Sequence, residues 1–197
     1  MSEARDRAHF NRWSSTYEQS WMQKYLARVH EVMLGEVAPD QPVNHIVDVG
    51  CGTGRLLRRA AVRWPAAVLV GVDPAESMID VARRLTPQAT FEVAQAAKLP
   101  LAAEGADVVF SSVSMHHWPD PAAGLREAAR VLQPSGRLVL ADVAVPRWLG
   151  WLWRSGKGTK ADLMRLVVGA GLMVVRLQPL LGGVVLVITA DKVRAAA

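Results

Sequence analysis

A glycine-rich turn constrains this chain more than any other feature of its sequence. The heptapeptide "DVGCGTG", Asp48 to Gly54, ends a short β-branched run, "HIVDVG", and is followed by "RLLRRAAVRW", which has helical spacing. Glycines at every second position leave the backbone uncovered, so that its amide groups can point at a ligand beside the positive end of the helix. The pattern predicts a strand, a tight turn and a helix around a carboxylate- or phosphate-bearing ligand.

An acidic residue at the end of the next predicted strand narrows the ligand. Asp73 closes "AVLVGVD", 23 residues after Gly50. A carboxylate at the tip of the neighbouring strand can accept both hydroxyls of a ribose. A dinucleotide site would need its third glycine where Arg55 stands, and the G-K-[ST] ending of a nucleotide triphosphate loop is missing. We therefore predict a nucleoside-like cofactor lying across two strand ends.

Helix and strand signals alternate along the rest of the chain. Further strands are predicted in "ATFEVA", "GADVVFSS" and "GRLVLADVAV", and helices in "PAESMIDVARRL", "PAAGLREAARVL" and "KADLMRLVVGAGL". Pro74 is expected just inside the start of its helix. The last two strands flank a Gly182–Gly183 turn, which permits only an antiparallel pair. The order predicts an α/β fold: a three-layer α/β/α sandwich around a mostly parallel seven-stranded sheet with a C-terminal antiparallel hairpin.

Composition indicates one domain of ordinary globular character. The 197 residues are 51% hydrophobic and 21% charged. One cysteine, Cys51, excludes a disulfide framework within the chain and fits a reducing compartment, so we expect a cytoplasmic protein. Residues 5–35 carry apolar side chains at helical spacing, and Ser14 and Ser15 interrupt them, which predicts two helices divided at the serines.

Positive charge is concentrated in the C-terminal quarter. Residues 1–142 hold 15 Lys and Arg against 16 Asp and Glu, whereas residues 143–197 hold 8 against 2. Within that quarter, Pro146 to Lys160 carries three tryptophans and four cations. This segment has the character of a lid over an apolar acceptor, of a membrane-surface contact, of a subunit interface or of a cap on the sheet. The sequence leaves these readings open.

The glycine turn matches the first motif of a known family in full. "DVGCGTG" resembles the acidic residue and G-x-G-x-G of the class I S-adenosylmethionine-dependent methyltransferases, and "VGVDPAESMIDVARR" resembles their second motif. The stretch from "AQAAKLP" to "GRLVLAD" is similar to the small-molecule branch (methyltransferase type 11) that includes quinone-biosynthesis enzymes. "FNRWSSTYE" resembles the N-terminal helix of that branch. The resemblance implies a Rossmann-like fold and S-adenosyl-L-methionine as cofactor, with S-adenosyl-L-homocysteine as product.

The resemblance also assigns roles to individual residues. It implies that Asp73 holds the ribose, that Met78 packs on the adenine and that Tyr17 closes over the methionine end of the cofactor. The full expected cofactor set is Tyr17, Asp48, Gly50, Cys51, Gly52, Thr53, Gly54, Asp73, Pro74, Met78, Gln95, Ala96, Ala97 and Ser111.

One position departs from the family pattern. The family reads D-A-E-x-L-P after the third strand, and its aspartate accepts from the adenine amino group. The matching positions here are Gln95, Ala96 and Ala97. A glutamine accepts without charge and must be oriented, which we expect to weaken the contact by about 1 kcal/mol.

Two histidines are the candidate catalytic residues. His116 and His117 in "HHWPD" follow the fourth strand, where this fold places its acceptor, and a histidine there can take a proton near neutral pH. We expect His117 to be the base; the alternative is that one histidine packs or caps and the other faces solvent. Cys51 lies inside the glycine turn, which excludes covalent cytosine chemistry, and neither the histidines nor Asp142 have the spacing of a metal site.

The sequence thus favours methyl transfer to a small, hydrophobic acceptor whose O, N or C atom is undetermined. An RNA methyltransferase and a catalytically silent binding module with the cofactor fold remain as alternatives. The expected partners are a small-molecule acceptor and a membrane surface reached through 146–160; nucleic acid is disfavoured, and a monomer and a homodimer are both open. We expect one methyltransferase domain over 1–197, made of an N-terminal helical cap (1–38), a cofactor-binding core (43–143), a short lid (144–160) and a C-terminal helix and hairpin (161–192).

Overall fold

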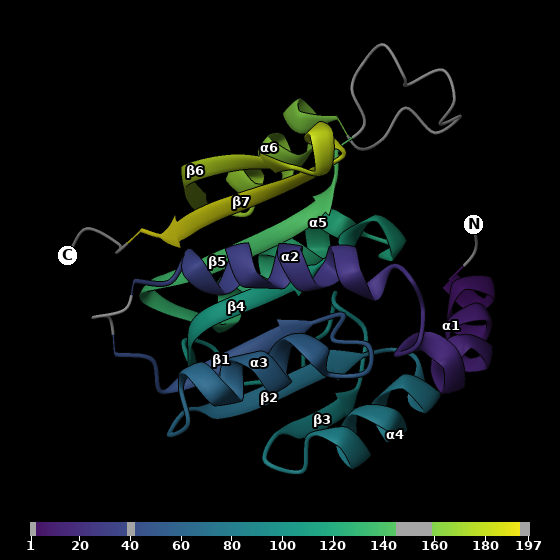
Figure 1. Ribbon diagram of the computed structural model, residues 1–197. Coiled ribbons are helices and arrows are strands. Elements are labelled where there is room, and N and C mark those ends of the chain that lie inside the picture. The colour runs from purple at the N-terminus through teal and green to yellow at the C-terminus, as the bar shows by residue number, and fades with distance from the viewer. Residues whose placement is uncertain (1–2, 39–41, 145–158, 194–197) are drawn as a thin grey trace.

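The computed structural model describes residues 3–38, 42–144 and 159–193 (Figure 1). Its helices are α1 (Glu3–Tyr17), α2 (Gln23–Gly35), α3 (Arg55–Arg63), α4 (Glu76–Leu85), α5 (Pro121–Val131) and α6 (Lys160–Gly169), with short 3₁₀ turns η1 (Met115–His117) and η3 (Leu181–Gly183). Its strands are β1 (His45–Val49), β2 (Val68–Asp73), β3 (Thr90–Val93), β4 (Ala106–Ser112), β5 (Leu132–Val143), β6 (Leu172–Leu180) and β7 (Val185–Lys192).

All seven strands join one sheet in the order β3-β2-β1-β4-β5-β7-β6. The first five pair in parallel, and β7 pairs antiparallel with both β5 and β6. Strand order reverses between β1 and β4, which is where ligands bind in open α/β sheets. The predicted mostly parallel sheet with a C-terminal antiparallel hairpin is confirmed.

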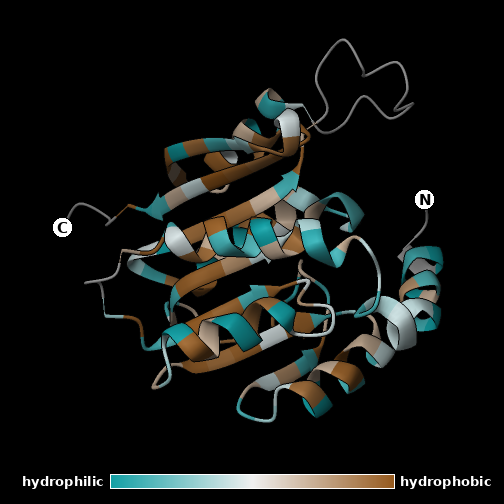
Figure 2. Cartoon of the chain, viewed as in Figure 1, coloured by the Kyte–Doolittle hydropathy of each residue, from teal (hydrophilic) through white to brown (hydrophobic). Residues whose placement is uncertain are grey.

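Two apolar clusters form the core, one on each face of the sheet. Helices α2, α3 and α4 cover one face, where Met33 and Leu57 pack against Ile46 and Phe110. Helices α5 and α6 cover the other, where Leu125 and Leu163 belong to the second cluster. Strand β4 is buried along almost its whole length, and the central strands are largely hydrophobic while the visible helices carry hydrophilic and hydrophobic residues (Figure 2). The chain is thus the predicted three-layer sandwich.

The predicted break at the two serines is wrong. Helix α1 continues through Ser14 and Ser15 to Tyr17, and the turn lies at residues 18–22. The hydroxyl of Ser14 donates to the carbonyl of Asn11 at 2.9 Å, so the serine is satisfied inside the helix. Trp21 falls in the turn and is 71% exposed, although it lies in the stretch 5–35 whose apolar spacing predicts helix.

Pro74 lies outside α4, because the helix begins at Glu76 with Ala75 as its N-cap. Most of the tryptophan-rich segment 146–160 lies outside the described residues, and so does most of the expected lid. In the part of the chain that the structure describes, no helix has both the length and the apolar character needed to cross a membrane.

Candidate functional site

A pocket lies at the carboxyl ends of β1, β2 and β4, at the point where strand order reverses. It contains about 830 Å³ of empty space, part of which is open to solvent. Its walls come from the glycine turn after β1, the end of β2, the segment after β3, the loop after β4 and helix α1.

The glycine turn and Asp73 meet in this pocket, as the sequence predicted. The amide of Gly52 donates to Oδ2 of Asp73 at 3.0 Å, and the amide of Ala75 donates to Oδ1 at 2.8 Å. Gly52 and Gly54 both adopt positive φ angles, 52° and 74°. A Cβ atom on Gly52 would meet nothing within 4 Å, so this turn presents bare backbone to open space.

Buried carboxylates surround the turn. Burial raises the pKa of Asp73 to about 6, and the amides of Ala75 and Gly52 partly offset that rise. Burial, with a smaller contribution from Asp73, raises the pKa of Asp48 to about 8. Oδ1 of Asp48 has no hydrogen-bond partner among the described residues. Both carboxylates would be stabilised by a cationic ligand, because positive charge nearby favours their ionised form.

The structure divides the expected cofactor residues into two groups. Eight of them line the pocket: Tyr17, Gly50, Gly52, Asp73, Pro74, Met78, Gln95 and Ala96. Six are not among its lining residues: Asp48, Cys51, Thr53, Gly54, Ala97 and Ser111. Cys51 and Thr53 are buried, and the hydroxyl of Ser111 bonds that of Ser114 at 3.0 Å.

Helix α1 forms a side of the pocket of which the sequence predicted only one residue, Tyr17. Beside the expected Tyr17, it contributes Asp6, Arg7 and Phe10. Phe10, Trp13 and Tyr17 form a continuous ring ladder, with centroids 6.3 Å apart for the first pair and 4.8 Å for the second. Their spacing of three and four residues was visible, but helical spacing alone does not say which ligand or element the face meets.

The two candidate catalytic histidines occupy different positions. His117 lines the pocket, with its Nδ1 atom 3.7 Å from Oδ2 of Asp6 and its ring 5.1 Å from that of Phe10. His116 is not a lining residue; its Nδ1 atom lies 2.7 Å from Oδ1 of Asp142. Burial, and then the neighbouring His116, lower the pKa of His117. A neutral imidazole is therefore present at the pocket wall near neutral pH.

Trp118 forms the adjoining wall and is held in place by α5. A Cβ atom on Gly124 would lie 2.4 Å from Cε3 of the Trp118 ring, so any residue larger than glycine would overlap the ring in its present position. The N-cap of α5 is Asp120, whose side chain accepts from the amide of Ala123 at 2.9 Å. "HHWPD" therefore supplies the base candidate, an aromatic wall and the start of a helix.

Comparison with known proteins gives the domain type. Residues 47–140 match the family model described as a methyltransferase domain. An uncharacterized methyltransferase of Mycobacterium tuberculosis is 38% identical over 122 residues, 61% of this chain and 49% of the relative. The 27-O-demethylrifamycin SV methyltransferase of Amycolatopsis mediterranei is 31% identical over 175 residues, 85% of this chain and 60% of the relative. The chain thus spans about half the length of the first of these curated relatives.

Solved structures share the fold. The methyltransferase of Haloferax volcanii, in complex with the activator Trm112, superposes with a TM-score of 0.78 at 20% identity over 94% of this chain and 98% of that one. The geranyl diphosphate C-methyltransferase of Streptomyces coelicolor, in complex with S-adenosyl-L-homocysteine, gives 0.72 at 15% identity over 85% and 79%. At these identities the likeness concerns the fold alone.

Proposed function

Because residues 47–140 match a methyltransferase domain, we propose that this chain is a class I S-adenosylmethionine-dependent methyltransferase that transfers a methyl group from S-adenosylmethionine to a small, hydrophobic acceptor. The observation that carries the proposal is the hydrogen bond between Gly52 and Asp73, which brings the glycine turn and the acidic strand end together in one pocket. Bound there, the cofactor supplies an electrophilic methyl group on a positively charged sulfur.

The lining residues fit such a cofactor. Asp73 still has lone pairs for ribose hydroxyls after accepting its two backbone amides. Met78 and Ala96 offer an apolar surface for the adenine, and Gln95 stands beside it with a side-chain amide. The open space beside the Gly52 backbone leaves room for the methionine end, and Tyr17 closes that side.

His117 is the proposed base. A hydroxyl or amine acceptor loses a proton on methylation, and a neutral imidazole in the pocket can take it. The lowered pKa of His117 keeps that imidazole unprotonated at neutral pH. Phe10 and Trp118 flank it with aromatic surface, which favours an apolar acceptor held in line with the methyl group.

In the described part of the basic C-terminal quarter, ion pairs favour the small-molecule reading over the RNA one. Three of its described cations are already in ion pairs: Arg165 with Asp162, Arg176 with Glu36 at 3.5 Å, and Lys192 with Glu104 at 3.4 Å. Cations that are paired in this way contribute less to a phosphate-binding surface.

Calorimetric titration with S-adenosylmethionine and S-adenosylhomocysteine tests the proposal. We expect binding by the wild type, and a loss of about tenfold or more in Asp73→Asn, which keeps an acceptor but removes the charge. The matched control is Asp80→Asn, because Asp80 is an exposed acid on α4 that pairs with Arg83 at 3.7 Å. Absence of binding by folded wild-type protein would refute the proposal and leave the binding-module alternative.

A further inference from the structure

Helix α1 covers the pocket without joining the core. Four of its residues line the pocket, namely Asp6, Arg7, Phe10 and Tyr17. Neither apolar cluster contains a residue of α1, although both contain residues of the helices that cover the sheet. In Figure 1 the helix lies beside the body of the domain, next to α4. Its position over the pocket therefore depends on its contacts with α4 and on polar contacts with the rest of the domain.

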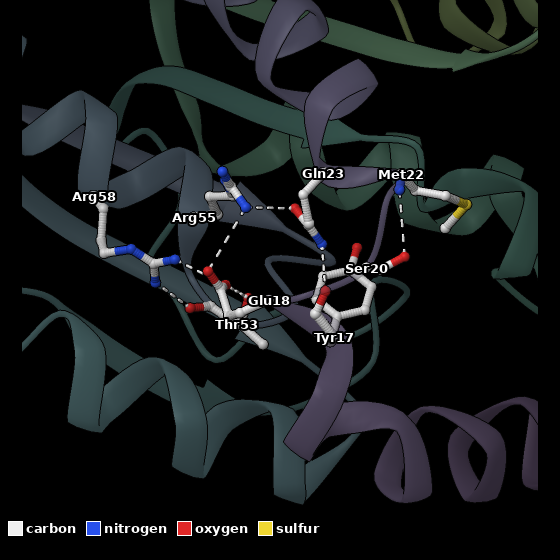
Figure 3. Close-up of polar contacts among 8 residues, drawn as sticks. All are labelled: Tyr17, Glu18, Ser20, Met22, Gln23, Thr53, Arg55 and Arg58. Atoms are coloured by element: carbon white, nitrogen blue, oxygen red, sulfur yellow. Dashed lines mark hydrogen bonds and ion pairs between the residues drawn. The ribbon is translucent and has the colours of Figure 1, made fainter.

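Glu18, the first residue after α1, makes the densest of these contacts (Figure 3). Its Oε1 atom accepts from the hydroxyl of Thr53 and from Nη2 of Arg58, the latter at 2.8 Å. Its Oε2 atom lies 3.7 Å from Nη1 of Arg55. Arg58 also donates to the carbonyl of Thr53 at 2.7 Å. One carboxylate thus joins the end of α1 to the glycine turn and to the start of α3.

A second set of contacts, made by Gln23, fixes the backbone of Tyr17, which lines the pocket. Nε2 of Gln23 donates to the carbonyl of Tyr17 at 2.9 Å, and Oε1 of Gln23 accepts from Nη1 of Arg55 at 2.9 Å. Gln23 is buried, with 4% of its surface exposed. Gln23 therefore links the backbone of Tyr17 to Arg55 on α3. The next residue, Glu18, contacts α3 directly.

The Glu18 contacts are partly shielded from water. The side chains of Glu18 and Arg58 are 29% and 24% exposed, and Thr53 is only 1% exposed. Hydrogen bonds to charged groups are stronger than neutral ones, and partial burial reduces their screening by salt. Thr53, expected from the sequence to bind the cofactor, uses its hydroxyl for Glu18 instead.

We propose that Glu18 is a positioning residue for the cofactor: by binding Thr53, Arg58 and Arg55, it holds α1 and Tyr17 closed over the pocket and slows cofactor release. The inference rests on the proposed function, because it concerns the same pocket. It differs from a purely structural role in that the contacts join the covering helix to the cofactor turn itself. Loosening them should change the rate at which ligand leaves more than the rate at which it arrives.

The test compares Glu18→Gln, Arg58→Gln and the double variant with the wild type. In the free protein, hydrogen exchange should quicken about tenfold over residues 10–17 and stay unchanged in β4 and β5. S-adenosylhomocysteine, followed by stopped-flow fluorescence, should dissociate about fivefold faster, with association within about twofold of wild type. The double variant should lose little more than the worse single variant, because both remove one cluster.

Glu31→Gln is the matched control, since Glu31 forms an exposed pair with Arg28 at 2.9 Å on α2. Wild-type exchange and wild-type release in folded Glu18→Gln would overturn the inference. Additive losses in the double variant would do the same. If Glu18→Gln does not fold, Thr53→Val replaces it in the test, because this variant removes only the hydroxyl that donates to Glu18. If the wild type binds no S-adenosylhomocysteine, both the proposed function and the proposed slow release of cofactor fail. If hydrogen exchange in α1 is unchanged in Glu18→Gln, only the proposed role of Glu18 in holding α1 is refuted.

Discussion

Nδ1 of His116 lies 2.7 Å from Oδ1 of Asp142, and the other oxygen of Asp142 accepts the backbone amide of His116 at 3.1 Å. The carboxylate is fully buried at the end of β5. It therefore fixes both the ring and the backbone of His116, whose ring centroid is 4.0 Å from that of His117. The sequence did not link Asp142 with His116, because their contact spans 26 residues.

Asp142→Asn should reduce turnover by about tenfold or more while cofactor affinity stays within about twofold. The asparagine amide keeps the shape of the carboxylate but lacks the charge that orients His116. The ring of His117, which lies beside that of His116, should then be held less firmly. Steady-state kinetics and calorimetry on the same preparation measure the two effects. Asp191→Asn serves as control, because it breaks the ion pair with Arg137 on β5 (2.8 Å) without touching the pocket. Equal losses in both variants would point to general destabilisation.

His117→Ala should lower turnover about tenfold or more with cofactor binding unchanged. In the wild type, kcat/KM should fall as the pH drops through the pKa of His117, because the protonated ring cannot accept a proton. Since burial and His116 lower that pKa, this acid limb should lie below pH 6.5, the ordinary value. His45→Ala, at the exposed start of β1, should keep the wild-type profile. A wild-type rate in His117→Ala would exclude this base.

Stability should decline as pH rises, because Asp48 holds a proton in the folded chain more tightly than in the unfolded one. Its pKa rises from 3.8 to about 8 on folding. The folded state therefore binds more protons between these values, and the stabilisation is present below pH 3.8 and is lost as pH approaches 8. Asp48→Asn should be more stable than wild type at pH 8 by urea unfolding and should have a flatter profile, while Asp80→Asn should follow the wild-type curve. A wild-type slope in Asp48→Asn would contradict this assignment.

Gly54→Ala and Gly52→Ala should separate stability from binding. At Gly54 the φ angle is 74° and an added Cβ would lie 2.8 Å from Cζ of Phe91, so strain and overlap should together cost about 2–3 kcal/mol of unfolding free energy. At Gly52 the Cβ would meet nothing, which leaves backbone strain of about 1 kcal/mol. The methyl at Gly52 would instead project into the ligand space. Denaturant unfolding and calorimetry should therefore rank the two variants in opposite orders.

The sheet and its helices were predictable because their signals are local. The buried run before Asp48 and the spacing in Arg55–Arg63 each fix an element within about ten residues, and alternation of such elements limits the topology. The pocket wall at Gly52 and Asp73 was predictable for the same reason, since both stand at strand ends.

The missed features depend on contacts between distant segments. Nothing in the sequence near Glu18 indicates that its carboxylate meets Thr53 and Arg58, which lie 35 and 40 residues away. The break expected at Ser14 failed because a serine inside a helix can bond a preceding carbonyl without ending the helix. Spacing identified the apolar face of α1 and the family resemblance placed Tyr17 at the cofactor, but only the folded chain adds Asp6, Arg7 and Phe10 to the pocket wall.

The close approach of Gly124 to Trp118 means that the width of the pocket is controlled from behind its wall. Gly124 lies on α5, and any larger residue there would drive the indole ring toward the space that His117 faces. Acceptor range could therefore narrow or widen through substitutions on α5 that leave every lining side chain in place. A search for altered selectivity in this protein has reason to begin on that helix.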